Sequence, residues 1–99
     1  MQAKKCYIAG CIGNLTEAEY TANFEKAKLE VMELGFDPVS PLDLPHNHGK
    51  TWCEYMREDL IEMLKCHSLY ALSNWRKSPG ATIEINTAVS VGMHIIHQQ

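Results

Sequence analysis

Glu84 is the acidic residue of this sequence whose spacing best suits a chemical role. It lies three residues after Ala81 and four before Ala88, so it shares the small-residue face of a predicted helix. A small-residue face packs closely on a sheet, and the helix N-terminus favours an ionised carboxylate nearby. The sequence therefore predicts a carboxylate over the end of a sheet. The alternative interpretation is a solvated glutamate in the first turns of a helix.

Asp59 is a second carboxylate at the border of an apolar helix face. Met56 precedes it by three residues and Met63 follows it by four, so it lies beside that apolar stripe. A functional interpretation places this carboxylate in the same site as the first. The structural alternative is a residue at the rim of the core that pairs with Arg57 or Lys65.

The segment Ser78-Pro79-Gly80 has the composition of a helix start, with a hydroxyl at the N-cap and proline in the first turn. The unpaired N–H groups of such a start, together with a hydroxyl, can bind an anion. Capping alone explains the same residues without any ligand.

Histidine and cysteine do not form a convincing metal or nucleophile pattern. His46, His48 and Cys53 offer three ligands across a proline-bounded loop, and no second pair lies nearby in the sequence. Cys66 and His67 are neighbours at the start of a strand, where adjacent side chains point in opposite directions. The sequence contains neither a Gly-x-Gly-x-x-Gly motif nor a phosphate-binding Walker loop. We therefore expect no metal and no cofactor.

The elements that must position these residues alternate along the chain. Strands are predicted over 5–12, 36–40, 68–72 and 93–97, and helices over 16–34, 51–65 and 78–92. Thr16 is the expected N-cap of the first helix, and Gly35 the expected stop. The predicted buried faces of the first two helices comprise Tyr20, Phe24, Ala27, Val31 and Leu34, and then Trp52, Met56, Leu60 and Met63.

This β-α-β-α-β-α-β order predicts an α/β fold. We expect one doubly wound domain over residues 1–99, flavodoxin- or Rossmann-like, with a parallel sheet of about four strands and helices on both faces. Ligands of such sheets bind beyond the carboxyl ends of the strands. That rule selects the loops at 9–14, 40–50 and 73–80.

Composition excludes several classes of function. The chain has 99 residues, 12 Asp and Glu against 9 Lys and Arg, and a net charge of −3. It lacks the basic stripe that nucleic-acid binding requires. Its longest uncharged stretch, residues 85–99, is too short to span a bilayer. We expect neither a nucleic-acid nor a membrane partner.

Compartment and assembly follow from the cysteines and the size. The apolar run after Lys4 and Lys5 is short and interrupted by glycine, which is not typical of a signal peptide. The four cysteines lie in regular segments, which indicates reduced thiols and a cytoplasmic protein. Because a core of this size is marginal, a homodimer or larger homo-oligomer is expected.

Three groups of residues resemble a known superfamily. They are Tyr7-Ile8-Ala9-Gly10 after the first strand, Asp59 on the second helix, and the motif Trp75-x-x-Ser78-x-Gly80-Ala81-x-x-Glu84-x-x-x-Ala88. Together they resemble the nucleoside 2-deoxyribosyltransferase-like superfamily, and in particular its small branch known as DUF4406. The resemblance covers residues 5–97.

This resemblance implies an enzyme that acts at an N-glycosidic bond. The glutamate at position 84 would attack C1′ of the sugar, Asp59 would hold or protonate the base, and Tyr7 would orient the nucleophile. Ser78 stands where the transferases have aspartate and where related deoxynucleotide N-glycosidases have a phosphate-binding serine. The implied substrate-binding residues are Gly10, Ser78, Gly80 and Trp75.

Two functions of different class remain open at this point. The first is cleavage or transfer at the N-glycosidic bond of a (deoxy)nucleoside or its 5′-monophosphate. The second is a non-catalytic module on the same fold that binds a nucleotide or a nucleotide-derived signal. Both take a small-molecule partner.

Overall fold

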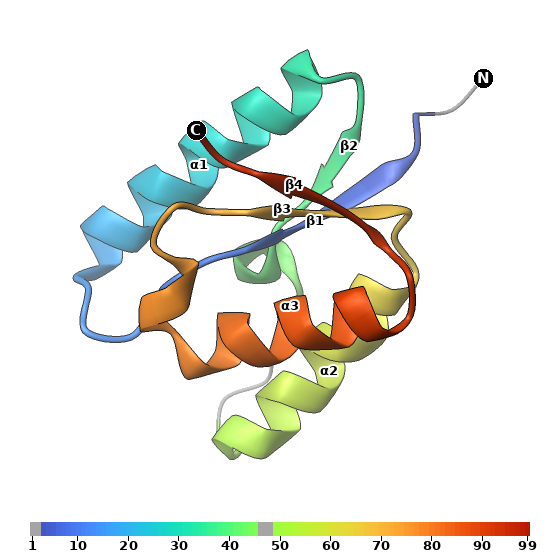
Figure 1. Ribbon diagram of the computed structural model, residues 1–99. Helices are drawn as coiled ribbons and strands as arrows, with labels where there is room; N and C mark the ends of the chain where they lie inside the picture. The colour runs from blue at the N-terminus through green and yellow to red at the C-terminus, as the bar shows by residue number, and fades with distance from the viewer. Residues whose placement is uncertain (1–2, 46–48) are drawn as a thin grey trace.

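The computed structural model describes residues 3–45 and 49–99, in which strands and helices alternate as predicted (Figure 1). In chain order the elements are β1 (Lys5–Ala9), α1 (Glu17–Glu33), β2 (Asp37–Val39), the 3₁₀ turn η1 (Pro41–Asp43), α2 (Trp52–Leu64), β3 (Ser68–Ala71), the 3₁₀ turn η2 (Trp75–Lys77), α3 (Pro79–Ser90) and β4 (His94–His97).

The strands form one parallel sheet of four strands in the order β2-β1-β3-β4. Tyr7 at the centre of β1 pairs in register with Val39 of β2 and Leu69 of β3. In Figure 1 the sheet is seen nearly edge-on, with α1 on one side and α2 and α3 on the other. The predicted doubly wound α/β architecture is confirmed.

Each face of the sheet has its own buried cluster, because side chains alternate along a strand. Beneath α1 the cluster contains Cys6, Ile8, Phe24, Ala27, Val31, Tyr70 and Leu72. Beneath α2 and α3 it contains Tyr7, Ala9, Met63, Cys66, Leu69, Ala71, Ala81, Ile85 and Ala88. Tyr7 therefore lies under α2 and α3, within reach of side chains from those helices.

Local signals set the helix ends. Thr16 and Glu19 form a reciprocal capping box at the start of α1. Gly35 follows α1 with a φ of 90°, a left-handed conformation that glycine adopts without strain. Ser78 caps α3, and Pro79 is its first residue. These predicted boundaries are confirmed.

Three predicted core residues lie outside the buried clusters, and one of them, Tyr20, is partly exposed. Leu34 is 53% exposed because α1 ends at Glu33, one residue before the apolar pattern does. Trp52 is the first residue of α2 and is 55% exposed, and it lines a cavity instead of the core. Its predicted place on the buried face is wrong, whereas Met56 and Met63 of the same stripe are buried.

The four cysteines are free thiols. Within the described residues, no helix combines the length and apolar character that crossing a membrane requires.

Candidate functional site

The site is built around a buried hydrogen bond between β1 and α3. The Tyr7 hydroxyl donates to Glu84 Oε2 at 2.6 Å. Tyr7 is completely buried, and Glu84 is 5% exposed. The small residues Ala81 and Ala88, which share the face of Glu84, are buried against the sheet. This close packing brings the Glu84 carboxylate to the tyrosine hydroxyl.

The environment of this pair favours the protonated forms. Burial and, to a smaller extent, the Asp59 charge raise the pKa of the Glu84 carboxyl to about 8, despite the lowering effect of the Tyr7 hydrogen bond. The pKa of Tyr7 is raised above its ordinary value, first by burial and then by the charges of Glu84 and Asp59. A strongly shifted carboxyl in a cavity is typical of a functional site.

Glu84 and Asp59 line one cavity of about 760 Å³ at the carboxyl ends of β1 and β3. The loop after β1, the η1 turn, the first turns of α2 and the start of α3 enclose it. The loop after β1 belongs to the cavity because β1 lies between β2 and β3, where the strand order reverses. All three predicted ligand loops contribute to it.

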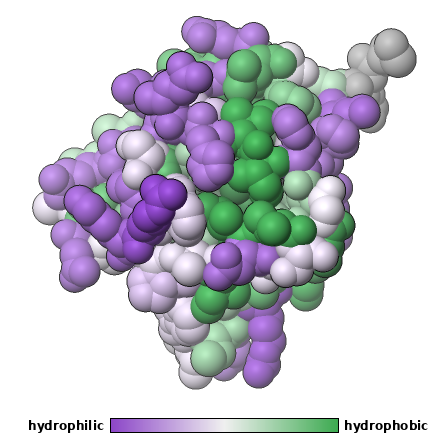
Figure 2. Space-filling model, viewed as in Figure 1, coloured by the Kyte–Doolittle hydropathy of each residue, from purple (hydrophilic) through white to green (hydrophobic). Residues whose placement is uncertain are grey.

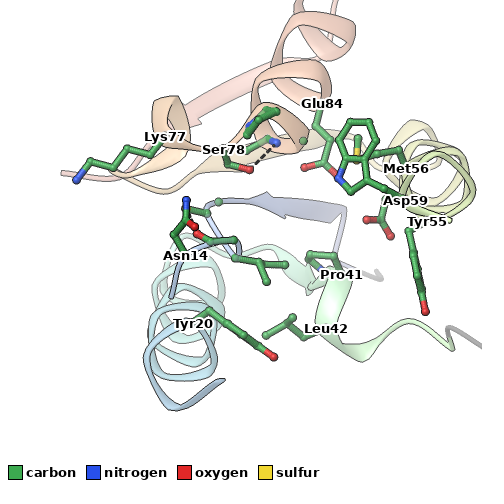
Figure 3. A pocket seen from close by; sticks show the side chains of 18 of the residues that line it. Asn14, Tyr20, Pro41, Leu42, Tyr55, Met56, Asp59, Lys77, Ser78 and Glu84 are labelled. Carbon is green, nitrogen blue, oxygen red and sulfur yellow. Dashed lines mark hydrogen bonds between the residues drawn. The ribbon is translucent and has the colours of Figure 1, made fainter. Parts of the chain in front are cut away.

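The cavity has two chemically different ends (Figure 3). Asn14, Lys77 and Ser78 lie at one end, and Tyr55, Met56 and Asp59 lie at the other, with the Glu84 carboxylate between them. Tyr20 and Leu42 lie on the opposite wall. Trp52 also lines the cavity. The arrangement suits an elongated molecule with a polar end and a flat apolar end.

Two glycines permit the close packing that shapes this cavity. A Cβ built on Gly10 would lie 2.3 Å from Leu72 Cδ1 and 2.7 Å from its Cγ. A Cβ on Gly80 would lie 3.1 Å from Met56 Sδ, which is a tight contact. Glycine at position 80 therefore allows α2 and α3 to approach each other. That approach brings Asp59 and Glu84 to the same cavity.

Ser78 lies at the polar end and its hydroxyl already has a structural role. Ser78 Oγ accepts a hydrogen bond from the Ala81 N–H at 3.1 Å, as expected of an N-cap. Ser78 and Gly80 both line the cavity. Pro79 has no N–H, and the Ala81 and Thr82 N–H groups donate to Ser78, so the start of α3 presents mainly its positive helix-dipole end to whatever binds there.

Trp75 was predicted to bind substrate, but the structure places it at a different hollow. That hollow has a volume of about 380 Å³ and includes Arg76 and His97 in its wall. The Arg76 guanidinium carbon lies 4.7 Å from the centre of the Trp75 ring. The expected contact between Trp75 and a ligand in the larger cavity therefore finds no support in the geometry.

Several cavity residues carried no functional signal in the sequence. Trp52 and Tyr20 were interpreted as core residues, and Asn14 and Lys77 were not singled out as site residues. Asn14 has a φ of 69°, the left-handed conformation that asparagine tolerates better than most residues. In the sequence, the one sign of a role for Asn14 was its place in a turn directly after a strand.

Asn74 fixes the loop after β1 from outside the cavity wall. Its side-chain Oδ1 accepts a hydrogen bond from the Cys11 N–H at 3.1 Å. This contact joins the loops that follow β1 and β3, the two central strands. The sequence did not predict this contact, because an asparagine in a loop does not indicate its hydrogen-bond partner.

Among residues 3–45 and 49–99, the structure contains no group of three or more His, Cys, Asp or Glu side chains that could hold a metal ion. His46 and His48 of the weighed zinc pattern lie outside the described residues.

The arrangement can support attack at an electron-poor carbon. A carboxylate held by a tyrosine stabilises or bonds to a developing positive charge, and a second carboxyl group can exchange a proton with a departing group. The same cavity can also simply bind a small molecule.

No curated protein matches this sequence. The model of a family described as a domain of unknown function, DUF4406, matches residues 4–97. Because this match spans nearly the whole chain, the protein belongs to the DUF4406 family.

Proposed function

We propose that this protein cleaves or transfers at the N-glycosidic bond of a (deoxy)nucleoside or a (deoxy)nucleoside 5′-monophosphate. The observation that carries the proposal is the Glu84 carboxylate, held by Tyr7 at 2.6 Å in the wall of a cavity that also contains Asp59. A cleft with one positioned carboxylate and a second acid nearby is the minimum that glycosidic chemistry requires.

In the first step, an ionised Glu84 oxygen forms a bond to C1′ as the C1′–N bond breaks. The electron pair of that bond stays on the base nitrogen, and a protonated Asp59 transfers its carboxyl proton to the base. The positive charge that develops on the sugar lies against the Glu84 carboxylate. Burial makes this pairing favourable because water does not screen it.

In the second step, water or the nitrogen of another base attacks C1′ and releases Glu84. Water gives hydrolysis, and a second base gives transfer. The proton of the attacking group passes to the Asp59 carboxylate that the first step left ionised. The tyrosine hydroxyl keeps the carboxylate in place throughout, and it exchanges no proton with the substrate.

The two ends of the cavity suggest how the substrate lies. The base fits the end with Tyr55, Met56 and Asp59, and the sugar lies at Glu84. The 5′ group then points to Ser78 at the start of α3. A phosphate is favoured there by the positive end of the α3 helix dipole.

The experiment is incubation of the purified protein with a panel of deoxynucleosides and their 5′-monophosphates, followed by chromatography for free base. Each reaction is repeated with a second free base to detect transfer. Released base or an exchanged nucleoside supports the proposal. The absence of both, with every substrate, contradicts it.

The raised pKa of Glu84, about 8, favours a second candidate. At neutral pH a carboxyl with this pKa is mostly protonated, and a protonated carboxyl donates a hydrogen bond to a ligand instead of attacking it. The protein would then be a nucleotide-binding module. A rise in melting temperature on addition of a nucleotide, without base release, would favour this function.

Ser78 tests the class of substrate within the proposed function. Ser78→Asp keeps an N-cap but places a negative charge where a phosphate would lie. Preference, measured as the ratio of kcat/KM values, should move from deoxynucleotides to deoxynucleosides by about 10-fold or more, the effect of losing a hydrogen bond to a charged group. An unchanged ratio would show that Ser78 is a cap alone.

A further inference from the structure

The two edges of the sheet differ in their capacity to accept another strand. At one edge, the Asp37 N–H donates to the Lys4 carbonyl, so the amide of the next residue points away from β1. That residue is Pro38, which has no N–H to donate. An exposed charge, Asp37, lies beside it. Proline and charge are common protections of an edge strand.

The other edge, β4, carries neither protection. Its sequence is His94-Ile95-Ile96-His97, and no Asp, Glu, Lys or Arg occurs from Ile85 to Gln99. Both isoleucines are partly exposed, and Val89 and Val91 shortly before the strand are exposed. Figure 2 shows a hydrophobic band over this edge of the molecule.

The outward hydrogen-bonding groups of β4 can be identified from its pairing with β3. The Gln98 N–H donates to the Ala71 carbonyl, which lies on β3. Since alternate residues of a strand point the same way, Ile96 also faces β3 with its backbone groups. The backbone groups of Ile95 and His97 therefore point away from the sheet.

We propose that a second copy of this chain pairs with β4 in the antiparallel direction, around a two-fold axis at Ile96. In this register each Ile95 exchanges both backbone hydrogen bonds with the partner's His97. Ile96 contacts the partner's Ile96 on the face of the sheet covered by α1, where the side chain of Ile96 lies. The two sheets become continuous.

Two observations favour a second copy of this chain as the partner of β4, and favour this register. An uncharged edge is complementary to itself, because no like charges face each other across the two-fold axis. A register centred on Ile95 would need the Met93 amide, which already donates to the Ala88 carbonyl. The centre at Ile96 uses only backbone groups that point outward from β4.

Light scattering on a size-exclusion column tests the interface. The wild-type protein should elute at about twice its chain mass of 11.2 kDa. Ile96→Lys should halve that mass, because two lysines then oppose each other at the axis. Leu64→Lys, a matched charge at an exposed apolar residue of α2, should leave the mass doubled. A monomeric wild type at millimolar concentration, or a monomer caused by Leu64→Lys alone, overturns the proposal.

Disulfide cross-linking tests the register without relying on a destabilising charge. In a Cys53→Ser background, which removes the exposed thiol, Ile96→Cys should form a symmetric disulfide on mild oxidation. Opposed residues of a non-hydrogen-bonded antiparallel pair lie about 4.5 Å apart at Cα, within the range a disulfide spans. Ile95→Cys should cross-link at least about 10-fold more slowly, since the two copies of Ile95 lie on a diagonal. Equal rates, or a faster Ile95→Cys, contradict the register.

Discussion

Two tyrosine–glutamate pairs lie on opposite faces of the sheet. On the face covered by α2 and α3, the Tyr7 hydroxyl donates to Glu84 at 2.6 Å. On the face covered by α1, the Tyr70 hydroxyl donates to Glu30 at 2.9 Å, and the Gln98 side chain donates to the same Glu30 oxygen at 2.7 Å. Each pair joins a strand tyrosine to a helix glutamate.

Their surroundings differ. Glu84 is buried, faces a cavity and lies in the field of Asp59, whereas Glu30 is half-buried and joins α1 to the C-terminal residues. Burial and the Glu30 hydrogen bond raise the pKa of Tyr70 to about 12, so that hydroxyl remains a donor at any ordinary pH. A tyrosine–glutamate pair thus joins structural elements on one face and forms a candidate reactive group on the other. Desolvation and a second carboxylate make the difference.

The largest expected effect comes from exchanging the two glutamates for glutamine. Glu84→Gln should lower base release by about 10³-fold or more, because an amide keeps the size and the tyrosine hydrogen bond but does not attack carbon. Glu30→Gln, the matched control, should change the rate by less than about 2-fold, since its site holds no substrate. Steady-state rates of base release measure both. Equal losses in the two variants would end the distinction between the pairs.

Removing the two tyrosine hydroxyls should give a smaller contrast. Tyr7→Phe should lower kcat/KM at neutral pH by about 10- to 100-fold, the range for losing one hydrogen bond to a charged group. Tyr70→Phe should leave kcat/KM nearly unchanged and cost about 1 kcal/mol of unfolding free energy. Urea denaturation and kinetics on the same preparations separate the two effects. A catalytic loss in Tyr70→Phe as large as in Tyr7→Phe would contradict the comparison.

The pH profile tells how Glu84 acts. A nucleophile must be ionised, so the rising limb of the kcat/KM profile should have a pKa of about 8. Tyr7→Phe removes a hydrogen bond that lowers this pKa, so the profile should move to higher pH. Asp59→Asn removes a charge that raises it, so the profile of the residual activity should move to lower pH. A profile that falls through pH 8 would identify Glu84 as an acid.

The smallest expected effect is on the pH dependence of stability, and it should arise from Glu84 and not from Glu30. The folded pKa of Glu84 lies above its ordinary value of 4.5, so the folded state binds more protons between about pH 4.5 and 8. Its contribution to stability is fully present below 4.5 and is lost as pH rises through about 8. Glu84→Gln has no charge to bury. The melting temperature of Glu84→Gln minus that of the wild type should therefore increase as pH rises.

Glu30→Gln is the control for that measurement. Glu30 is half-buried and its carboxylate accepts hydrogen bonds from Tyr70 and Gln98, so its charge carries no comparable desolvation cost. The difference in melting temperature between Glu30→Gln and the wild type should therefore show no comparable rise. Melting curves from pH 4 to 9 measure both differences. If the difference between Glu84→Gln and the wild type does not change with pH, the buried carboxyl does not carry a shifted pKa.

Local features of the sequence predicted much of the fold and part of the site. Thr16, Gly35 and Ser78 act at helix ends through their own backbone and nearest turns, so their roles follow from type and spacing. Glu84 was predicted to face the sheet because Ala81 and Ala88 share its face, and a helix repeats its faces regularly. Alternation of strands and helices predicted the parallel sheet.

Only the tertiary structure decided which distant residues meet. Tyr7 and Glu84 are 77 positions apart, and their contact depends on the strand order, which helix and strand periodicity do not specify. Trp52 and Trp75 show the same limit, because an aromatic residue at the end of an element packs in the core or lines a cavity according to what lies beside it. The pKa of Glu84 is a property of burial and of Asp59 on another helix. The sequence by itself determined the elements and their caps, since these depend on neighbours within a turn. The chemistry of the carboxyl was decided by long-range packing, since desolvation and charge act between residues that only the fold brings together.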